Sequence, residues 1–412
     1  MEQKRCTKFR PTHNCLTLLV VNSLTMISLP TRSFENLPTP FYYYDEGLLR
    51  ATLDALNEQV ARHPNFIVHY ATKANANLRI LQIIKEAGLG VDCVSGGEIE
   101  TALHVGFKAD NIVFAGVGKS DWEIKLALEN NIFCFNVESI QELEVIEQLC
   151  NEMNQQANVC LRVNPNVNAH THKNITTGLA ENKFGIPVDC VWETIEKMQA
   201  MKHVRFIGLH FHIGSQIVNL NDFRELCTSV NSLLELLKQH NIEPEHINVG
   251  GGLGIDYEDP TSHPIPDFKA YFDMYAQHLQ LNDKQIVHFE LGRSLVGQCG
   301  YLVSRVLYVK QGQSKRFLIL DAGMNDLLRP ALYHAKHQIV NLSNPSVTSE
   351  VYDVVGPVCE SSDIFSRDVL LPQSHRGDLM AICSVGAYGE AMASQYNCRQ
   401  LPKSYLSDDF NI

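Results

Sequence analysis

The sequence of 412 residues lacks several features that mark particular protein classes. Its 12 cysteines are scattered and form no C-x-x-C pair, which argues against a zinc ribbon or a thioredoxin-like site. They are too sparse for a disulfide scaffold, so we expect reduced thiols in a cytoplasmic enzyme. The net charge is −12 and basic residues cluster only in the first ten positions, which argues against a nucleic-acid partner.

No apolar run is long enough to cross a bilayer, so we expect no membrane partner. The run 16–21 follows four basic residues and superficially resembles a secretory signal. It is short, polar residues interrupt it, and no convincing small-residue cleavage site follows. We interpret residues 1–30 as a disordered extension, with a translation start at Met26 as an alternative.

Beyond residue 46, short apolar runs alternate with stretches of helical periodicity. The runs are rich in Val, Ile and Phe, as expected for parallel strands buried on both faces. This alternation predicts an α/β fold in which a (β/α)8 TIM-type barrel is the main unit. The expected strands are 66–72, 90–95, 111–117, 132–138, 158–164, 205–213, 246–250 and 286–291. The clearest helical stretches are 46–62, 97–106, 121–130, 140–154, 222–240 and 266–281.

After Arg293 the pattern changes to strand-like segments separated by polar turns. This indicates a second, mostly antiparallel β domain beside the barrel. The predicted strands are 301–309, 316–320, 338–342, 351–355 and 379–384. We therefore predict a barrel over 47–292, and a second domain over 31–46 and 293–412 that the β-prone stretch 39–45 completes.

Chemically unusual residues follow the ends of the predicted barrel strands, where a barrel of this kind builds its active site. Lys73 follows the first strand, His212 the sixth, Gly250–Gly252 the seventh, and Glu290 ends the eighth. Together these residues suggest pyridoxal phosphate chemistry. They supply a reactive amine, an aromatic ring that can stack, a glycine turn that can bind a phosphate, and a carboxylate.

Each of these residues also has a plainer interpretation. A lysine at a strand end is most often a surface residue, and a glycine run can be a tight turn without a ligand. Glu290 can form a structural ion pair with Arg293 instead of contacting a pyridine nitrogen. The spacing of the glycines excludes a dinucleotide fingerprint.

A metal site is the main alternative chemistry, because His210-Phe211-His212 and His170-Thr171-His172 contain paired histidines. A barrel metallohydrolase would need such a pair at the first strand and an aspartate at the eighth. The sequence has Tyr-Ala-Thr-Lys and Glu-Leu-Gly-Arg at those places, so we expect no metal.

Taken together, the motifs resemble those of the fold-type III pyridoxal-phosphate-dependent decarboxylases, from about Thr39 to Asn397. In the barrel they are YATKAN (70–75), SGGEIE (95–100), GLHFHIGSQ (208–216), NVGGGLGI (248–255) and ELGR (290–293). In the second domain they are DAGMND (321–326), RPALY (329–333), GPVCESSD (356–363) and AYG (387–389). Leu291 and Ser362 stand where the family usually has proline and glycine, and neither change removes a functional side chain.

The resemblance implies a carboxy-lyase whose cofactor, pyridoxal 5'-phosphate, forms a Schiff base with Lys73. Implied cofactor contacts are Lys73, His212, Ser215, Gly251, Gly252, Glu290, Gly292, Arg293 and Tyr388. Implied substrate contacts are Arg293, Arg329, Tyr333, Glu360 and Tyr388. The resemblance further implies a homodimer in which Cys359, as the proton donor, and Glu360 enter the partner's active site.

Within the family, the motifs are most similar to those of enzymes that convert meso-2,6-diaminoheptanedioate to L-lysine and CO2, the last step of lysine biosynthesis. This substrate keeps one carboxylate, for which Arg293, Arg329 and Tyr333 offer a cationic clamp. An ornithine, arginine or polyamine substrate would leave buried arginines unpaired. A non-catalytic pyridoxal phosphate carrier is a further alternative, but such carriers lack the second domain.

Overall fold

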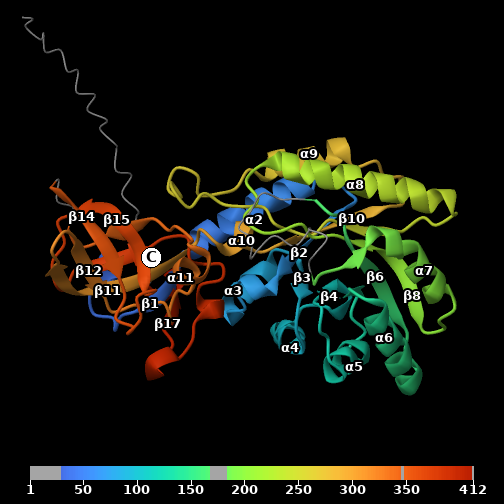
Figure 1. The fold of residues 1–412 in the computed structure, drawn as a ribbon, viewed down its shortest axis with the longest axis horizontal. Helices are drawn as coiled ribbons and strands as arrows, with labels where there is room; N and C mark the ends of the chain where they lie inside the picture. Colours follow the sequence, from blue (N-terminus) through green and yellow to red (C-terminus); the bar gives the residue numbers. More distant parts are fainter. Residues whose placement is uncertain (1–28, 168–182, 345–347, 411–412) are drawn as a thin grey trace, which may run out of the picture.

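The computed structural model describes residues 29–167, 183–344 and 348–410, which form two lobes (Figure 1). The larger lobe is a barrel of strands wrapped by helices, and the smaller lobe is built mainly of strands. Of the predicted extension 1–30, all but the last two residues lie outside the described residues. His170 and His172 also lie outside them.

The larger lobe is a closed barrel of eight parallel strands, as the sequence predicted. The barrel closes where β10, the last strand, pairs with β2, the first, and β5 pairs with β6. The strands are β2 (Phe66–Ala71), β3 (Gly90–Cys93), β4 (Ile112–Phe114), β5 (Cys134–Val137), β6 (Ala157–Asn164), β8 (Val204–His210), β9 (His246–Asn248) and β10 (Ile286–Leu291). A two-residue strand, β7 (Ile186–Pro187), extends the sheet beside β6.

Strand β10 illustrates why these apolar runs become buried strands. Phe289 points toward the surrounding helices and packs against the rings of Phe66, Phe272 and Tyr275. Its neighbours His288 and Glu290 lie on the opposite face of the strand, inside the barrel. Alternation along one strand thus anchors the barrel wall and lines its interior.

Helices follow the strands and cover the barrel, with α8 and α9 lying side by side on one flank (Figure 1). They are α2 (Glu46–Val60), α3 (Leu78–Glu86), α4 (Gly96–Val105), α5 (Asp121–Glu129), α6 (Ile140–Met153), α7 (Val191–Gln199), α8 (Leu220–Gln239) and α9 (Phe268–His278). The sequence prediction missed α3 and α7, both nine residues long. Length alone does not explain this, since α5 has the same length and was predicted.

Serine residues cap the first turns of α5 and α6, and the two caps differ in detail. The backbone N–H of Ser120 donates to the carboxylate of Glu123, which closes a capping box at α5. Ser139 accepts from the backbone N–H of Glu142 at 3.1 Å and caps α6. The Glu142 carboxylate accepts from the backbone N–H of Glu138 instead and also binds Lys119, so this cap is only half of a box.

The smaller lobe is a mostly antiparallel sheet, in the order β13-β16-β11-β12-β14-β15. Its strands are β11 (Gly300–Gln311), β12 (Arg316–Leu320), β13 (Ile339–Asn341), β14 (Ser349–Val355), β15 (Ile364–Pro372) and β16 (Leu379–Ile382). β1 (Phe41–Tyr44) joins this sheet by pairing with β11 and β17 (Lys403–Leu406). Three short α-helices remain among the described residues: α1 (Thr31–Phe34), α10 (Arg293–Val296) and α11 (Arg329–Tyr333).

Strands β15 and β17 were not predicted from the sequence. Polar residues interrupt β15 at Ser366, Arg367 and Asp368, which hides its strand character. The domain boundaries predicted at residues 46 and 292 remain predictions. The first of them coincides with the start of α2.

Candidate active site

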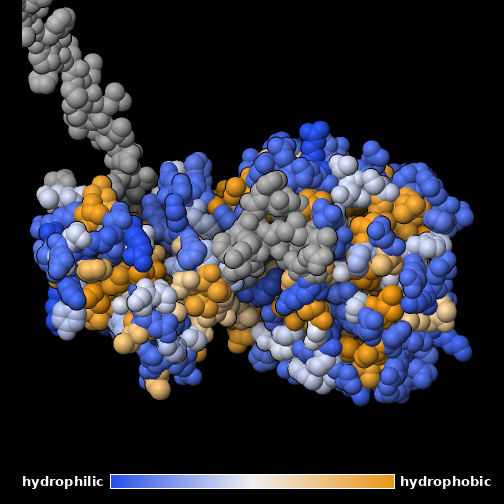
Figure 2. All heavy atoms as spheres, viewed as in Figure 1, coloured by the Kyte–Doolittle hydropathy of each residue, from blue (hydrophilic) through white to orange (hydrophobic). Residues whose placement is uncertain are grey.

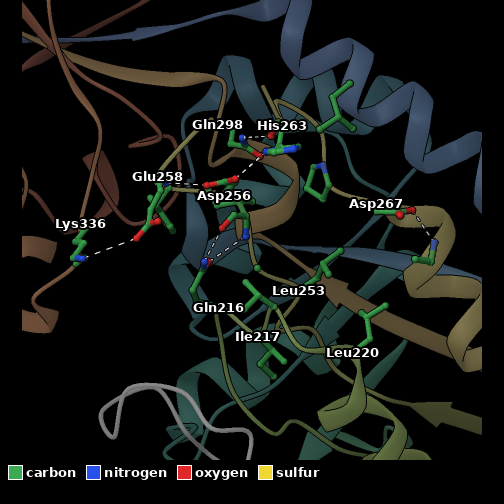
Figure 3. Close-up of a pocket in the computed structure, with 18 of the residues that line it drawn as sticks. Gln216, Ile217, Leu220, Leu253, Asp256, Glu258, His263, Asp267, Gln298 and Lys336 are labelled. Carbon is green, nitrogen blue, oxygen red and sulfur yellow. Dashed lines mark hydrogen bonds and ion pairs between the residues drawn. The ribbon is translucent and has the colours of Figure 1, made fainter. Parts of the chain in front are cut away.

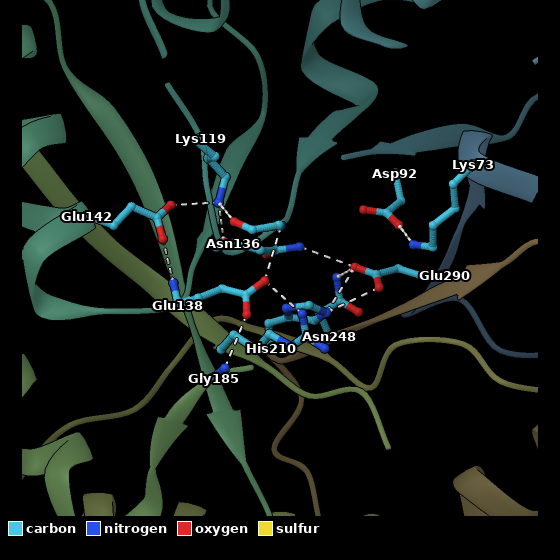
Figure 4. A network of polar contacts seen from close by, with 12 residues as sticks. Lys73, Asp92, Lys119, Asn136, Glu138, Glu142, Gly185, His210, Asn248 and Glu290 are labelled. Carbon is cyan, nitrogen blue, oxygen red and sulfur yellow. Dashed lines mark hydrogen bonds and ion pairs between the residues drawn. The ribbon is translucent and has the colours of Figure 1, made fainter. Parts of the chain in front are cut away.

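Lys73 lies just beyond β2, in a single 3-10 turn (Thr72–Ala74) at the carboxyl end of the barrel. Its Nζ donates to the Oδ2 atom of Asp92, at 2.9 Å, from the neighbouring strand β3 (Figure 4). The Lys73 side chain is 35% exposed, whereas that of Asp92 is completely buried. The lysine therefore faces a cavity and is held from behind by a carboxylate.

The charges around Lys73 favour its protonated form. Burial lowers the pKa of Lys73, but Asp92, Tyr388 and Glu290 outweigh it, and the net pKa lies above the ordinary value. A dry barrel mouth by itself would favour a neutral amine. The difference arises because the buried Asp92 carboxylate, invisible as a partner in the sequence, stabilises the ammonium.

Asp92 itself is a strongly perturbed acid. Burial, followed by the charge of Glu290, raises its pKa to about 7 against the lowering effect of Lys73. Its Oδ1 atom has no hydrogen-bond partner among the described residues. Because the pKa of Lys73 lies above that of Asp92, the proton stays on the amine and Asp92 serves as its counter-ion.

Glu290 at the end of β10 is surrounded by donors inside the barrel (Figure 4). Its Oε1 accepts from Asn248 at 2.8 Å and from Asn136 at 3.2 Å, and its Oε2 lies 3.2 Å from Nε2 of His210. Burial raises the pKa of Glu290, but His210 and Lys73 outweigh burial and hold it below the ordinary value. The carboxylate is therefore ionised and rigidly oriented.

The alternative of a structural ion pair between Glu290 and Arg293 is not observed within the described part of the chain. Arg293 instead donates to Ser215 Oγ at 2.9 Å and to the hydroxyl of Tyr257 at 2.6 Å. Its guanidinium also lies 4.8 Å from the ring centre of Tyr388. No carboxylate of the described residues neutralises this buried arginine, and its Nε atom has no partner among them.

The glycines after β9 form a close-packed turn that admits no side chain. A Cβ atom at Gly251 would lie 1.8 Å from the carbonyl oxygen of Glu290. Gly250 and Gly252 have φ angles of +71° and +107°, which other residues rarely adopt. The backbone N–H of Gly251 donates to Nδ1 of His212 at 3.2 Å, so the turn also orients that ring.

One cavity joins most of the residues that the sequence singled out. It is lined by Ala71, Lys73, His212, Ser215, Gly252, Leu253, Glu290, Gly292, Arg293 and Tyr388. Gly251 lies against it through its contacts with His212 and Glu290. The ends of four barrel strands, β2, β8, β9 and β10, and one segment of the second domain thus converge on this cavity.

A second cleft of about 760 Å³ lies between the loop after β9 and the second domain, and it contains Arg329 and Tyr333 (Figure 3). It shares Leu253 with the first cavity. Lys336 and Glu258 face each other across it at 4.0 Å. The guanidinium of Arg329 lies 4.8 Å from the ring centre of Tyr257, the residue that also binds Arg293.

Cys359 and Glu360 are not among the residues that line either cavity. Both are exposed, in the segment between β14 and β15. Glu360 accepts hydrogen bonds from Tyr396 and from Ser362. Within one chain, the structure therefore separates these two predicted residues from Lys73.

Five residues around the site were not identified as functional from the sequence. Asp92, Asn136, His210 and Asn248 come from the ends of β3, β5, β8 and β9, and Tyr257 from the loop after β9. Their position at strand ends is the signal that could have found four of them, because all parallel strands end at the same rim. Tyr257 lies further along its loop and carries no such signal.

In the described part of the chain, no group of three or more His, Cys, Asp or Glu side chains is arranged to hold a metal ion. Among the same residues, no helix combines the length and the apolar character that a membrane span requires.

Comparison with known proteins agrees with the fold. Residues 47–297 match the family described as pyridoxal-dependent decarboxylase, pyridoxal binding domain. The chain is 60% identical to diaminopimelate decarboxylase of Bacteroides thetaiotaomicron over 92% of this chain and 98% of the relative. It is 44% identical to the enzyme of the same name from Helicobacter pylori, over 92% and 93% of the two chains.

Solved structures give the same result. The crystal structure of Helicobacter pylori diaminopimelate decarboxylase complexed with L-lysine superposes with a TM-score of 0.86 at 41% identity, covering 92% of this chain and 94% of that one. A lysine/ornithine decarboxylase from Vibrio vulnificus, at 22% identity and a TM-score of 0.79, shares the fold. The chain belongs to the diaminopimelate decarboxylase family of pyridoxal-dependent decarboxylases.

Proposed function

We propose that this protein is a carboxy-lyase that converts meso-2,6-diaminoheptanedioate to L-lysine and CO2 with pyridoxal 5'-phosphate as cofactor. The observation that carries the proposal is the meeting of Lys73 and Glu290 in one cavity, beside arginines that no carboxylate of the described residues neutralises. The names of relatives that are 60% and 44% identical support the same reaction. This reaction is the last step of lysine biosynthesis.

The residues present fit the cofactor. Lys73 would bond its aldehyde carbon, and Glu290 would face its pyridine nitrogen. The turn at Gly251 and Gly252, which admits no Cβ atom, suits close approach of a phosphate, with Ser215 and the orphaned Nε atom of Arg293 nearby. His212, Gly292 and Tyr388 line the same cavity and would complete the contacts.

When bound, pyridoxal phosphate supplies an electron sink for the bond between Cα and the departing carboxylate. The chain's own residues set the conditions for this. Glu290, held ionised by Asn136, Asn248 and His210, keeps a proton on the ring nitrogen. Asp92 holds the ammonium of Lys73 whenever that amine is not bonded to the cofactor.

The side chain of the substrate would lie toward the second cleft. Arg329 is buried there without a carboxylate partner among the described residues, and Tyr333 lies beside it. The carboxylate that the product retains would pair with Arg329, and Arg293 and Tyr388 lie between this group and the cofactor. An ornithine or lysine substrate has no such carboxylate and would leave the arginine unpaired.

The active form is proposed to be a homodimer in the cytoplasm. Exposed Cys359 and Glu360 would enter the active site of the second copy, where Cys359 donates a proton to the carbon that has lost CO2 and Glu360 faces the distal ammonium. Tyr396 and Leu401 lie in the same domain and are 45% and 52% exposed. They offer apolar surface that a second copy would cover. Figure 2 shows apolar residues exposed on both lobes.

The direct test is turnover by the purified protein with pyridoxal phosphate. Equal amounts of L-lysine and CO2 from meso-2,6-diaminoheptanedioate are expected, with no CO2 from ornithine. Replacing Arg329 with alanine should abolish this preference, chiefly through a higher KM. Decarboxylation of ornithine but not of diaminoheptanedioate would contradict the assigned substrate.

The shared site has its own test. Cys359→Ala should lower kcat by at least about a hundredfold if Cys359 is the proton donor. Mixing this variant with Lys73→Ala chains should restore part of the activity, because each mixed dimer contains one site with both residues. No recovery on mixing, with mixed dimers demonstrated by mass, would contradict the shared site.

A further inference from the structure

His337 lies directly behind Arg329, in the segment that leads into β13. Its Nε2 lies 2.8 Å from Nη1 of Arg329, and its Nδ1 lies 2.8 Å from the carbonyl oxygen of Cys383. Both side chains are almost completely buried, at 6% and 4% exposure. The histidine therefore links the arginine to the backbone of the second domain.

The hydrogen bonds fix the state of this histidine. A carbonyl oxygen only accepts, so Nδ1 must carry the proton, and a guanidinium only donates, so Nε2 must present its lone pair. The ring is consequently neutral. Burial, and next the charge of Arg329, lower the pKa of His337 to about 3.

The hydrogen-bond acceptor behind the buried Arg329 is neutral, whereas a carboxylate would carry a negative charge. Within the described residues no carboxylate pairs with Arg329, and the Nε atom of Arg329 has no partner there. A carboxylate in the place of His337 would orient the guanidinium equally well but would cancel its charge. The histidine orients the group and leaves the full positive charge facing the cleft.

Aromatic packing completes the arrangement. The ring of Tyr257 meets the ring of His337 edge to face at 5.0 Å and lies 4.8 Å from the guanidinium of Arg329. Its hydroxyl accepts from Arg293. The ring of Tyr257 thus faces both arginines, since the guanidinium of Arg293 also lies over it, at 5.9 Å from its centre.

We propose that His337 is a positioning residue that presents Arg329, with its charge intact, to the carboxylate that the substrate retains. This inference rests on the proposed function and deepens it, because it names the residue behind the preference for a dicarboxylate substrate. His337 acts only through Arg329 and touches neither the cofactor nor the reacting carbon.

A purely structural role makes a different prediction. If His337 only fills space, phenylalanine should replace it best, because the contact with Tyr257 would survive. If it positions Arg329, glutamine should replace it best, because its amide can donate to Cys383 and accept from Arg329. Glutamate should be a poor replacement, since its charge neutralises the arginine and an ionised carboxylate cannot donate to the carbonyl oxygen of Cys383.

The experiment compares H337Q, H337F and H337E with the wild type, all loaded with cofactor. Calorimetry measures binding of L-lysine, which has the carboxylate, and of 1,5-diaminopentane, which is the same molecule without it. We expect H337F and H337E to bind lysine at least about tenfold more weakly, and H337Q to stay within about threefold. Binding of 1,5-diaminopentane should change by less than about twofold in all three. KM for diaminoheptanedioate should follow the lysine affinities, with kcat nearly constant.

The inference is overturned if H337F binds lysine as well as the wild type, or if both ligands weaken equally. Should H337E fail to fold, the opposite expectations for H337F and H337Q still decide the question. Failure of the wild-type protein to bind lysine or to release CO2 would instead overturn the proposed function itself.

Discussion

The barrel interior contains two layers of polar side chains, which differ in whether charged atoms are left unpaired beside the cavity. The lower layer consists of His69, His246 and His288, each on a strand that also contributes to the rim. Nε2 of His69 lies 2.9 Å from Nδ1 of His288, and Nε2 of His288 lies 2.9 Å from Nδ1 of His246. Phe133 packs against two of the rings. The three imidazoles are partners for one another, and the one ring nitrogen of His69 outside these contacts, Nδ1, is buried without a partner among the described residues.

The upper layer lies two residues further along the same strands. Glu290 follows His288 on β10, and Asn248 follows His246 on β9. Here charge remains that the described chain does not pair: Oδ1 of Asp92 and Nε of Arg293 are buried without a partner among those residues. The comparison shows that buried polar side chains alone do not indicate a functional site. Buried polar atoms that lack a hydrogen-bond partner beside a cavity do indicate one.

The largest effect is expected from the upper layer. Lys73→Ala should lower kcat at least about a thousandfold, because Lys73 supplies the only amine among the described residues that line the cavity. Release of CO2 from diaminoheptanedioate is the measurement, and Lys269→Ala, at an exposed lysine on α9, is the control. Turnover by Lys73→Ala at the wild-type rate would contradict the claim that the upper layer forms the active site.

Glu290→Gln should lower kcat about a hundredfold, because a neutral amide cannot keep the ring nitrogen protonated. Glu142→Gln is a matched control, since Glu142 is also buried but pairs with Lys119 away from the cavity. Steady-state kinetics should show a loss for Glu290→Gln only. Equal losses in the two variants would indicate that any buried carboxylate matters for structure alone.

His288→Leu should have the opposite profile. It leaves His69 and His246 without their shared partner, so the free energy of unfolding should fall by about 2 kcal/mol. Because none of these three histidines is among the described residues that line either cavity, kcat at neutral pH should change by less than about threefold. Urea denaturation with parallel kinetics checks this, and a stable but inactive variant would contradict the division into layers.

The smallest effect appears only in acid. Burial, opposed by the charge of Glu290, lowers the pKa of His69 to about 4. Below about pH 6.5 the unfolded chain therefore binds a proton at this histidine that the folded protein does not bind. Stability should therefore fall as the pH drops from about 6.5 toward 4. His69→Leu should make this slope shallower by up to about 1.4 kcal/mol per pH unit, one proton's contribution. An unchanged slope would show that His69 is protonated in the folded protein.

Much of the fold could be predicted from the sequence because its barrel strands are uniformly apolar and regularly spaced. All eight strands and the antiparallel character of the second domain were predicted correctly. Among the missed elements, β15 contains a polar stretch that hides its strand character, whereas α3 and α7 are no shorter than the predicted α5. Tertiary pairing decides such segments, and local pattern does not.

The site was predictable only in part. Strand-end position and motif resemblance were sufficient to single out Lys73 and Glu290, which the structure brings together in one cavity. They could not reveal that Asp92 binds Lys73 or that His337 supports Arg329. Those contacts join residues whose pairing depends on barrel closure or on a turn between short elements, and neither leaves a spacing in the sequence.

A crystal structure of the protein loaded with pyridoxal phosphate tests the central claim most directly. We expect continuous electron density between Nζ of Lys73 and the cofactor, with a carboxylate oxygen of Glu290 within hydrogen-bonding distance of the ring nitrogen. A cofactor bound elsewhere, or with its ring nitrogen turned away from Glu290, would contradict the account.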